Sequence, residues 1–137
     1  MGKKTEFVLW VTAVGILAYW SMVFAGLFPV EELVPGYSRW FLSFPLADAW
    51  IAATAGGAAW LGGRDRRLGA ILAAAAGSGL VFLGLYAFSY GVGSGLIRRA
   101  TPDEYVEIAI KIYCLTVGAG LIVAAYRSIG EPPPSVA

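Results

Sequence analysis

The sequence contains no histidine, a single cysteine and few charged residues. Without histidine the chain lacks the commonest general base and the commonest metal ligand, and it cannot hold a histidine-ligated haem. Cys114 alone cannot form an intrachain disulfide or a tetrahedral thiolate metal site. We therefore expect no metal and no cofactor, and we favour a function other than catalysis. The formal net charge of +1 gives no reason to expect a nucleic-acid partner.

Charged residues make up 14% of the chain and hydrophobic residues 58%, whereas soluble domains contain roughly 25% charged residues. A soluble domain of 137 residues could not bury so much apolar surface. Four apolar runs, at residues 7–30, 40–61, 68–91 and 105–126, each approach the ~20 residues that a helix needs to cross a bilayer. Lipid hydrocarbon cannot hydrogen-bond the backbone N–H and C=O groups, so these groups must bond to one another. We therefore expect these runs to be helices.

The pattern predicts an all-α membrane protein, a bundle of four transmembrane helices in up-down-up-down order. We assign residues 1–128 to this bundle and residues 129–137 to a flexible proline-rich tail. The first run could instead be a secretory signal, because Lys3 and Lys4 precede it. Its apolar core is longer than the ~7–15 residues of a signal, so we interpret it as a retained helix.

Lysine and arginine indicate the orientation. The N-terminus, second loop and tail hold one set: Lys3, Lys4, Arg64, Arg66, Arg67 and Arg127. The first and third loops hold the smaller set: Arg39, Arg98 and Arg99. Cytoplasmic loops carry the excess of these residues, so we expect both termini in the cytoplasm. The predicted location is a bacterial or archaeal cytoplasmic membrane. The expected partners are the lipid bilayer and further copies of the same chain in a homo-oligomer.

Small residues indicate how the second and third runs pack. Gly57 lies four residues after Ala53, and Gly77 lies four residues after Ala73. Such spacing lets helix backbones approach closely in a membrane. We therefore expect these two runs to form a tight antiparallel hairpin, although alanine and glycine are so abundant here that some matches arise by composition alone.

Ionisable residues within the runs are costly in a membrane and usually face the bundle interior. Asp48 lies about 12 Å and Lys111 about 9 Å from the outer ends of their runs, at 1.5 Å per residue. Glu107 precedes Lys111 by one turn, and Pro45, one turn before Asp48, is expected to kink the second helix. We predict a polar cluster in the outer leaflet in which Asp48 and Lys111 approach one another, directly or through water. The candidate ligand-binding residues are Asp48, Lys111, Glu107, Tyr86, Tyr90, Trp50 and Tyr19.

Three interpretations of the cluster stay open. The Asp48–Lys111 pair could fix helix register, it could form a ligand or ion pocket, or Lys111 could pair only with Glu107 or extend toward the outer interface. For the chain as a whole, the favoured hypothesis is a non-enzymatic module that binds an amphipathic ligand, a lipid or a partner helix. The alternative is an oligomeric transporter or channel subunit with Asp48 as its proton or cation site. A lipid enzyme using Asp48, Glu107, Lys111, Tyr86 or Cys114 is a third hypothesis.

Two segments, Phe44-Pro45-Leu46-Ala47-Asp48-Ala49-Trp50 and Gly84-Leu85-Tyr86 leading to Tyr90, carry a family resemblance. They resemble uncharacterised families of small four-helix bacterial membrane proteins, in which a proline and an aspartate interrupt the second helix. The resemblance implies the fold and the importance of Asp48, and it implies no activity. The chain is also similar in size to small multidrug exporters, but it lacks the carboxylate that those proteins carry within the first helix.

Overall fold

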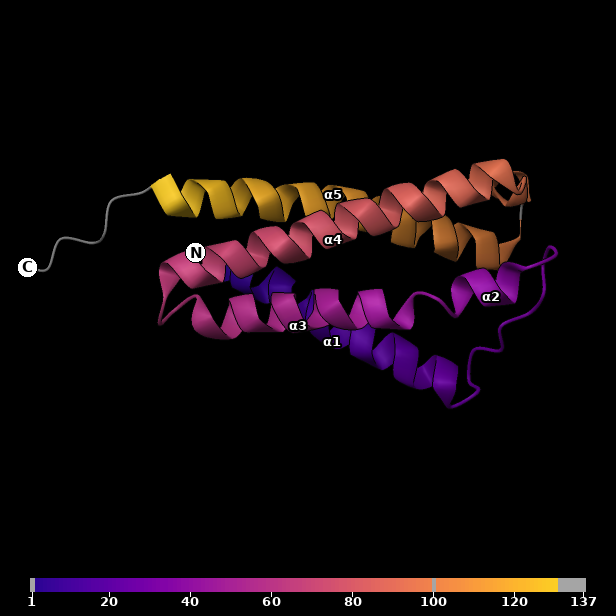
Figure 1. The fold of residues 1–137 in the computed structure, drawn as a ribbon, viewed down its shortest axis with the longest axis horizontal. Coiled ribbons are helices and arrows are strands. Elements are labelled where there is room, and N and C mark those ends of the chain that lie inside the picture. The colour runs from indigo at the N-terminus through magenta and orange to yellow at the C-terminus, as the bar shows by residue number, and fades with distance from the viewer. Residues whose placement is uncertain (1, 100, 131–137) are drawn as a thin grey trace, which may run out of the picture.

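The computed structural model describes residues 2–99 and 101–130, and within these ranges it contains helices and loops but no strand. The elements are α1 (Lys3–Phe24), α2 (Tyr37–Phe41), α3 (Pro45–Leu61), α4 (Arg66–Gly93), the short 3-10 helix η1 (Leu96–Arg98) and α5 (Pro102–Gly130). The four long helices extend along the longest axis of the molecule (Figure 1). The predicted all-α class is therefore confirmed. Most of the predicted proline-rich tail lies outside the described residues.

Three helices are long and apolar enough to cross a membrane. They are α1, α4 and the part of α5 from Glu104 to Gly130. The helix α3, which lies in the second predicted span, has 17 residues and is shorter than these three. The membrane character of the chain is thus supported by three helices.

The second apolar run is interrupted, which corrects the single helix predicted for residues 40–61. The helix α2 ends at Phe41 and α3 begins at Pro45, so a short turn separates them. Pro45 occupies the first turn of α3, where the backbone N–H that proline lacks would have had no helical partner. The sequence had suggested that Pro45 kinks the interior of a helix. In the structure Pro45 begins a helix instead.

The ends of two other helices also differ from the predicted runs. The helix α1 ends at Phe24 because Gly26 adopts a left-handed conformation, with φ +75°. The amide of Leu27 then donates to the carbonyl of Met22, an arrangement that closes a helix C-terminus. The helix α4 begins at Arg66 because the Asp65 carboxylate accepts a hydrogen bond from the Leu68 amide at 2.9 Å.

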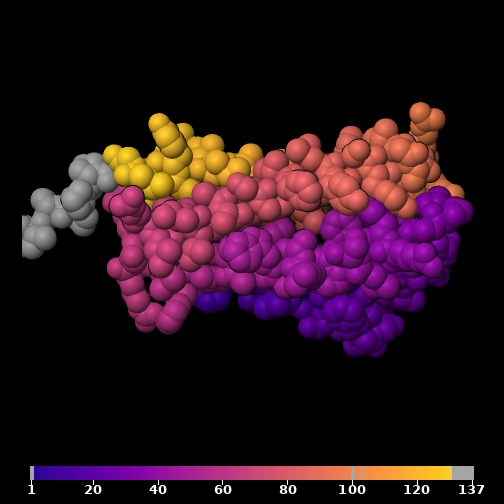
Figure 2. Space-filling model, in the orientation of Figure 1, coloured from indigo at the N-terminus to yellow at the C-terminus, as the bar shows by residue number. Residues whose placement is uncertain are grey.

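The helices pack in the order α1, α3, α4, α5. The predicted α3–α4 hairpin forms through fully buried alanines, among them Ala55 and Ala58 on α3 and Ala73 and Ala76 on α4. Side chains of these neighbouring segments meet along the face of the molecule seen in Figure 2. The helix α1 packs mainly on α3, whereas α5 packs mainly on α4. Contacts between α1 and α5 are sparse, so these two helices leave space between them.

The helices α4 and α5 approach one another closely at a pair of glycines. A Cβ atom placed on Gly77 would lie 2.7 Å from the carbonyl oxygen of Gly118, and one placed on Gly118 would lie 2.7 Å from the carbonyl oxygen of Gly77. Only glycine permits this mutual contact, because any side chain would overlap backbone atoms. Backbone contact through small residues is the usual basis of helix association in membranes.

We predict that Gly118→Ala destabilises the protein although alanine is the better helix former. Overlap with the backbone of α4 should cost about 1–3 kcal/mol. Gly120→Ala is the matched control, because a Cβ atom there meets nothing within 4 Å. Thermal unfolding in detergent should show a lower Tm for Gly118→Ala and an equal or higher Tm for Gly120→Ala. Equal stability of the two variants would contradict the proposed role of the contact.

The loop between α1 and α2 is ordered by the carboxylate of Glu32. This carboxylate accepts hydrogen bonds from the Gly36 amide, from the Ser38 hydroxyl, and from the Ser38 amide at 3.0 Å. The first of these amides precedes α2, and the second belongs to its first turn. The hydrogen bonds from Ser38 lower the pKa of Glu32 below its ordinary value.

A lowered folded-state pKa means that Glu32 stabilises the protein when it is ionised. This contribution is complete above the ordinary glutamate pKa of about 4.3 and is lost as the pH falls through the lower folded-state value. We therefore expect Glu32→Gln to lower Tm near neutral pH, with a difference from the parent that shrinks as the solution is acidified below about pH 4. Glu31→Gln, at the neighbouring exposed position, is the control and should show no such pattern.

Candidate functional site

The space between α1 and α5 forms a cavity of about 350 Å³ that is lined almost entirely by apolar atoms. Its walls come from all of the long helices and from α2, and Leu80 and Leu83 of α4 contribute to its lining. The lining residues Val11 of α1 and Ile110 of α5 are more than two-fifths exposed, so the cavity opens between these two helices. The volume lies at the lower end of the ~300–1,000 Å³ typical of ligand pockets.

Asp48 is the buried carboxylate on one side of this cavity. It lies in the first turn of α3 and is 8% exposed. The indole N–H of Trp20 on α1 donates a hydrogen bond to its Oδ2 at 2.7 Å. Its other oxygen, Oδ1, is buried and accepts no hydrogen bond from the described residues. An unpaired buried oxygen on a carboxylate is costly, and native structures contain few such groups without a reason.

Lys111 supplies the buried ammonium group on the α5 side. It is 4% exposed, and its Nζ lies 3.1 Å from Glu107 and 3.5 Å from Glu104. Glu107 also accepts a hydrogen bond from the Tyr37 hydroxyl, which ties α5 to α2. Glu104 lies near the N-terminus of α5, where the helix dipole favours a negative charge. Lys111 is thus shared by two carboxylates of its own helix.

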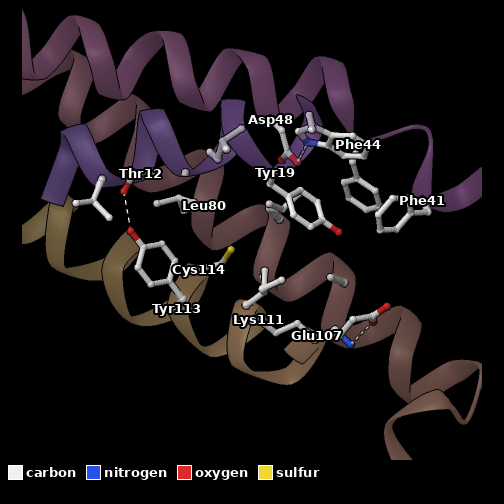
Figure 3. A pocket seen from close by; sticks show the side chains of 18 of the residues that line it. Thr12, Tyr19, Phe41, Phe44, Asp48, Leu80, Glu107, Lys111, Tyr113 and Cys114 are labelled. Atoms are coloured by element: carbon white, nitrogen blue, oxygen red, sulfur yellow. Dashed lines mark hydrogen bonds and ion pairs between the residues drawn. The ribbon is translucent and has the colours of Figure 1, made fainter. Parts of the chain in front are cut away.

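A hydrogen bond joins the two helices that border the opening. The hydroxyls of Thr12 on α1 and Tyr113 on α5 lie 2.8 Å apart, at one end of the cavity (Figure 3). The Thr12 hydroxyl donates to the carbonyl of Val8 at 2.8 Å, so the Tyr113 hydroxyl must donate to Thr12. This bond closes the end of the cavity that lies away from α2.

Aromatic rings surround Asp48 at the other end of the cavity. We name as the aromatic wall the five rings of Tyr19, Trp20, Trp40, Phe41 and Phe44, all of which line the cavity. The rings contact one another: Trp20 and Phe41 have centroids 5.3 Å apart, and Trp40 and Phe44 have centroids 4.8 Å apart. Figure 3 shows Tyr19, Phe44 and Asp48 grouped on one side, with Lys111 and Glu107 across from them.

The structure brings four of the seven sequence-predicted site residues to this cavity. Asp48, Glu107, Lys111 and Tyr19 all line it. The other three, Trp50, Tyr86 and Tyr90, are not among the lining residues. Trp50 is 63% exposed on the outside of the bundle. Tyr90 stacks on Trp40 with centroids 3.9 Å apart, and Tyr86 is about half exposed beside Phe82, so both support or flank the site from α4.

The sequence predicted that Asp48 and Lys111 approach one another directly or through water, and the structure shows no direct contact between their charged groups. Within the described residues no hydrogen bond or ion pair joins them, because Trp20 holds Asp48 while Glu104 and Glu107 hold Lys111. Similar predicted depths placed the two residues in one layer, but depth alone could not decide which side chains pair within that layer. Both nevertheless line the same cavity.

Sequence reasoning missed several contributors to the site, among them Trp20 and Glu104. Trp20 lies within the first apolar run, but no sequence signal identifies its N–H as the partner of Asp48. Glu104 was assigned to a loop, although Pro102 is typical of a helix start and the helix does begin there. No protein-family model, curated protein or solved structure matches this chain. The site must therefore be interpreted from its own geometry.

We predict that Trp20→Phe destabilises the protein by about 1–3 kcal/mol, because it leaves the Asp48 carboxylate without its indole partner. Trp10→Phe is the control on the same helix, at a position that is 43% exposed. Tm in detergent should fall clearly for the first variant and little for the second. If Asp48→Ala is combined with Trp20→Phe, the losses should not add, because each change removes one partner of the same hydrogen bond.

Proposed function

We propose that this protein is a four-span integral membrane protein that binds an amphipathic molecule in the cavity between α1 and α5. The observation that carries the proposal is the combination of an apolar cavity, open between two helices, with buried charged side chains on its walls. Ligand sites are mostly apolar concave spaces with a few polar groups that orient the ligand. An amphipathic molecule matches both parts, since its tail meets the apolar lining and its head meets Asp48, Lys111 or Glu107.

The proposed topology places α3 in the membrane beside the three longer helices. Its 17 residues extend about 26 Å at 1.5 Å per residue, which is close to the ~30 Å of a hydrocarbon core. The helix α3 packs between α1 and α4, both of which have membrane-spanning length and composition. The short helix α2 then lies toward the outer interface. Lysine and arginine counts favour cytoplasmic termini, and we propose the cytoplasmic membrane of a bacterial or archaeal cell as the location.

The opening between α1 and α5 would face lipid in this topology. A molecule could then enter sideways from the bilayer without first dissolving in water. The volume of about 350 Å³ suits a headgroup with part of one chain better than a whole phospholipid. The Thr12–Tyr113 bond closes one end of the cavity and the aromatic wall closes the other, so a compact head is a better occupant than a partner helix.

A cavity-filling variant tests this proposal. Gly15 lines the cavity, and a Cβ atom placed there meets nothing within 4 Å, so Gly15→Leu should fill space without disrupting the fold. Gly120→Leu is the matched control, because Gly120 is also helical and open but lies outside the cavity. Both variants should unfold at temperatures equal to or above that of the parent.

The measurement is photolabelling in nanodiscs by a single-chain lipid that carries a diazirine next to its headgroup. Labelled residues in the parent should include Asp48 or Glu107, identified by peptide mass spectrometry. We expect Gly15→Leu to bind the lipid at least about tenfold more weakly, which corresponds to about 1.4 kcal/mol, and Gly120→Leu to behave as the parent. If Gly15→Leu is labelled at the same residues and to the same extent, the cavity is not the binding site.

A further inference from the structure

The charges around the cavity indicate which kind of headgroup it selects. Three carboxylates, those of Asp48 and Glu107 on the lining and of Glu104 behind it, are accompanied among the described residues that line the cavity by one ammonium, that of Lys111. The ammonium is already in contact with two of them. Asp48 therefore has no cationic partner among the described residues, and its Oδ1 has no hydrogen-bond donor. A ligand with a positive charge would supply what the protein leaves unpaired.

The aromatic wall supports the same choice. The faces of tryptophan, tyrosine and phenylalanine attract cations, and cages of such rings are a recurrent way to bind ammonium groups. Here five rings line the cavity at the end where Asp48 lies, and Trp20 both donates to Asp48 and packs against Phe41. An anionic head at this end of the cavity would instead lie beside the Asp48 carboxylate. Electrostatics thus separates the two classes of headgroup.

We propose that the cavity binds an amphipathic ammonium compound, with the cationic head between Asp48 and the aromatic wall and the chain along the apolar lining toward the opening. This inference rests on the proposed function, because it names the ligand class of the same cavity. The ammonium group could belong to the headgroup of a membrane lipid or to a free lipophilic cation. Both sources present the same ammonium group to the cavity. A change of the lipid that surrounds the protein distinguishes them.

The test compares two probes with the same chain and opposite head charges, octyltrimethylammonium and octyl sulfate. Binding to the purified protein in phosphatidylglycerol nanodiscs is measured for the parent, Asp48→Asn, Phe41→Leu, Gly15→Leu and Gly120→Leu. Asparagine at position 48 keeps an oxygen for the Trp20 N–H and removes the charge, so the fold should persist. We expect Asp48→Asn to weaken octyltrimethylammonium binding at least about tenfold.

Phe41→Leu provides a second variant that does not depend on Asp48. It removes one ring of the aromatic wall and keeps an apolar side chain, so octyltrimethylammonium binding should weaken by about threefold to tenfold. Octyl sulfate should bind the parent poorly, and neither variant should weaken it further. Gly120→Leu should match the parent for both probes.

Two results would overturn the ammonium assignment while leaving the proposed function intact. One is equal octyltrimethylammonium binding by the parent, Asp48→Asn and Phe41→Leu, with Gly15→Leu still excluding both probes. The other is tighter parent binding of octyl sulfate than of octyltrimethylammonium, again abolished by Gly15→Leu. If Gly15→Leu has no effect on either probe, the proposed function fails together with the inference.

Repeating the titration in phosphatidylcholine nanodiscs distinguishes the two sources of the ammonium group. If lipid headgroups occupy the site, this host competes with the probe, and the difference between parent and Asp48→Asn should nearly disappear. If the site takes free lipophilic cations and excludes the lipid, the difference should be the same in both hosts. Either result supports the ammonium class and assigns its source.

Discussion

Backbone contact between α4 and α5 at Gly77 and Gly118 is the constraint on which the remaining architecture depends. Inside a membrane the apolar side chains gain nothing by leaving lipid for one another, so close packing must bring helices together. Through the mutual glycine contact one face of α4 packs on α5, while the alanine-rich face of α4 packs on α3. The helix α1 then packs on α3, which leaves α1 and α5 bordering an open space. The cavity is thus a consequence of where the small residues lie.

Large and polar side chains gather where the small residues stop. Alanines pack the interface of α3 with α4 in the half that leads to the short Gly62–Asp65 turn. Toward the other end, aromatic rings and ionisable groups replace them, and the backbones no longer need to touch. The same helices can therefore be tightly joined at one end and separated at the other. Tight packing at one end gives the molecule a stable scaffold, and helix separation at the other end leaves room for the proposed ligand.

The sequence predicted the helical class because long apolar runs have one stable form in a membrane, and it located Asp48 and Lys111 because ionisable residues stand out in such runs. It could not predict the break between Phe41 and Pro45, since hydropathy measures composition and is unaffected by a turn made of Leu42, Ser43 and Phe44. Depth along each helix placed Asp48 and Lys111 in one predicted layer, and both line the cavity. Rotation about the helix axis, which depends on packing, decided that Trp50 and Tyr86 lie outside the cavity.

The different surroundings of the two buried charges argue for a division of roles. Lys111 is held by Glu104 and Glu107 on its own helix, and Glu107 is tied to α2 through Tyr37, so this group has the partners that a structural ion pair requires. Among the described residues, Asp48 has a single hydrogen-bond donor, and its Oδ1 accepts no hydrogen bond from them. A structural role would be served as well by asparagine, which could accept the same bond from Trp20 without a charge. The proposed ammonium ligand would supply the counter-charge that the Asp48 carboxylate does not find among the described residues.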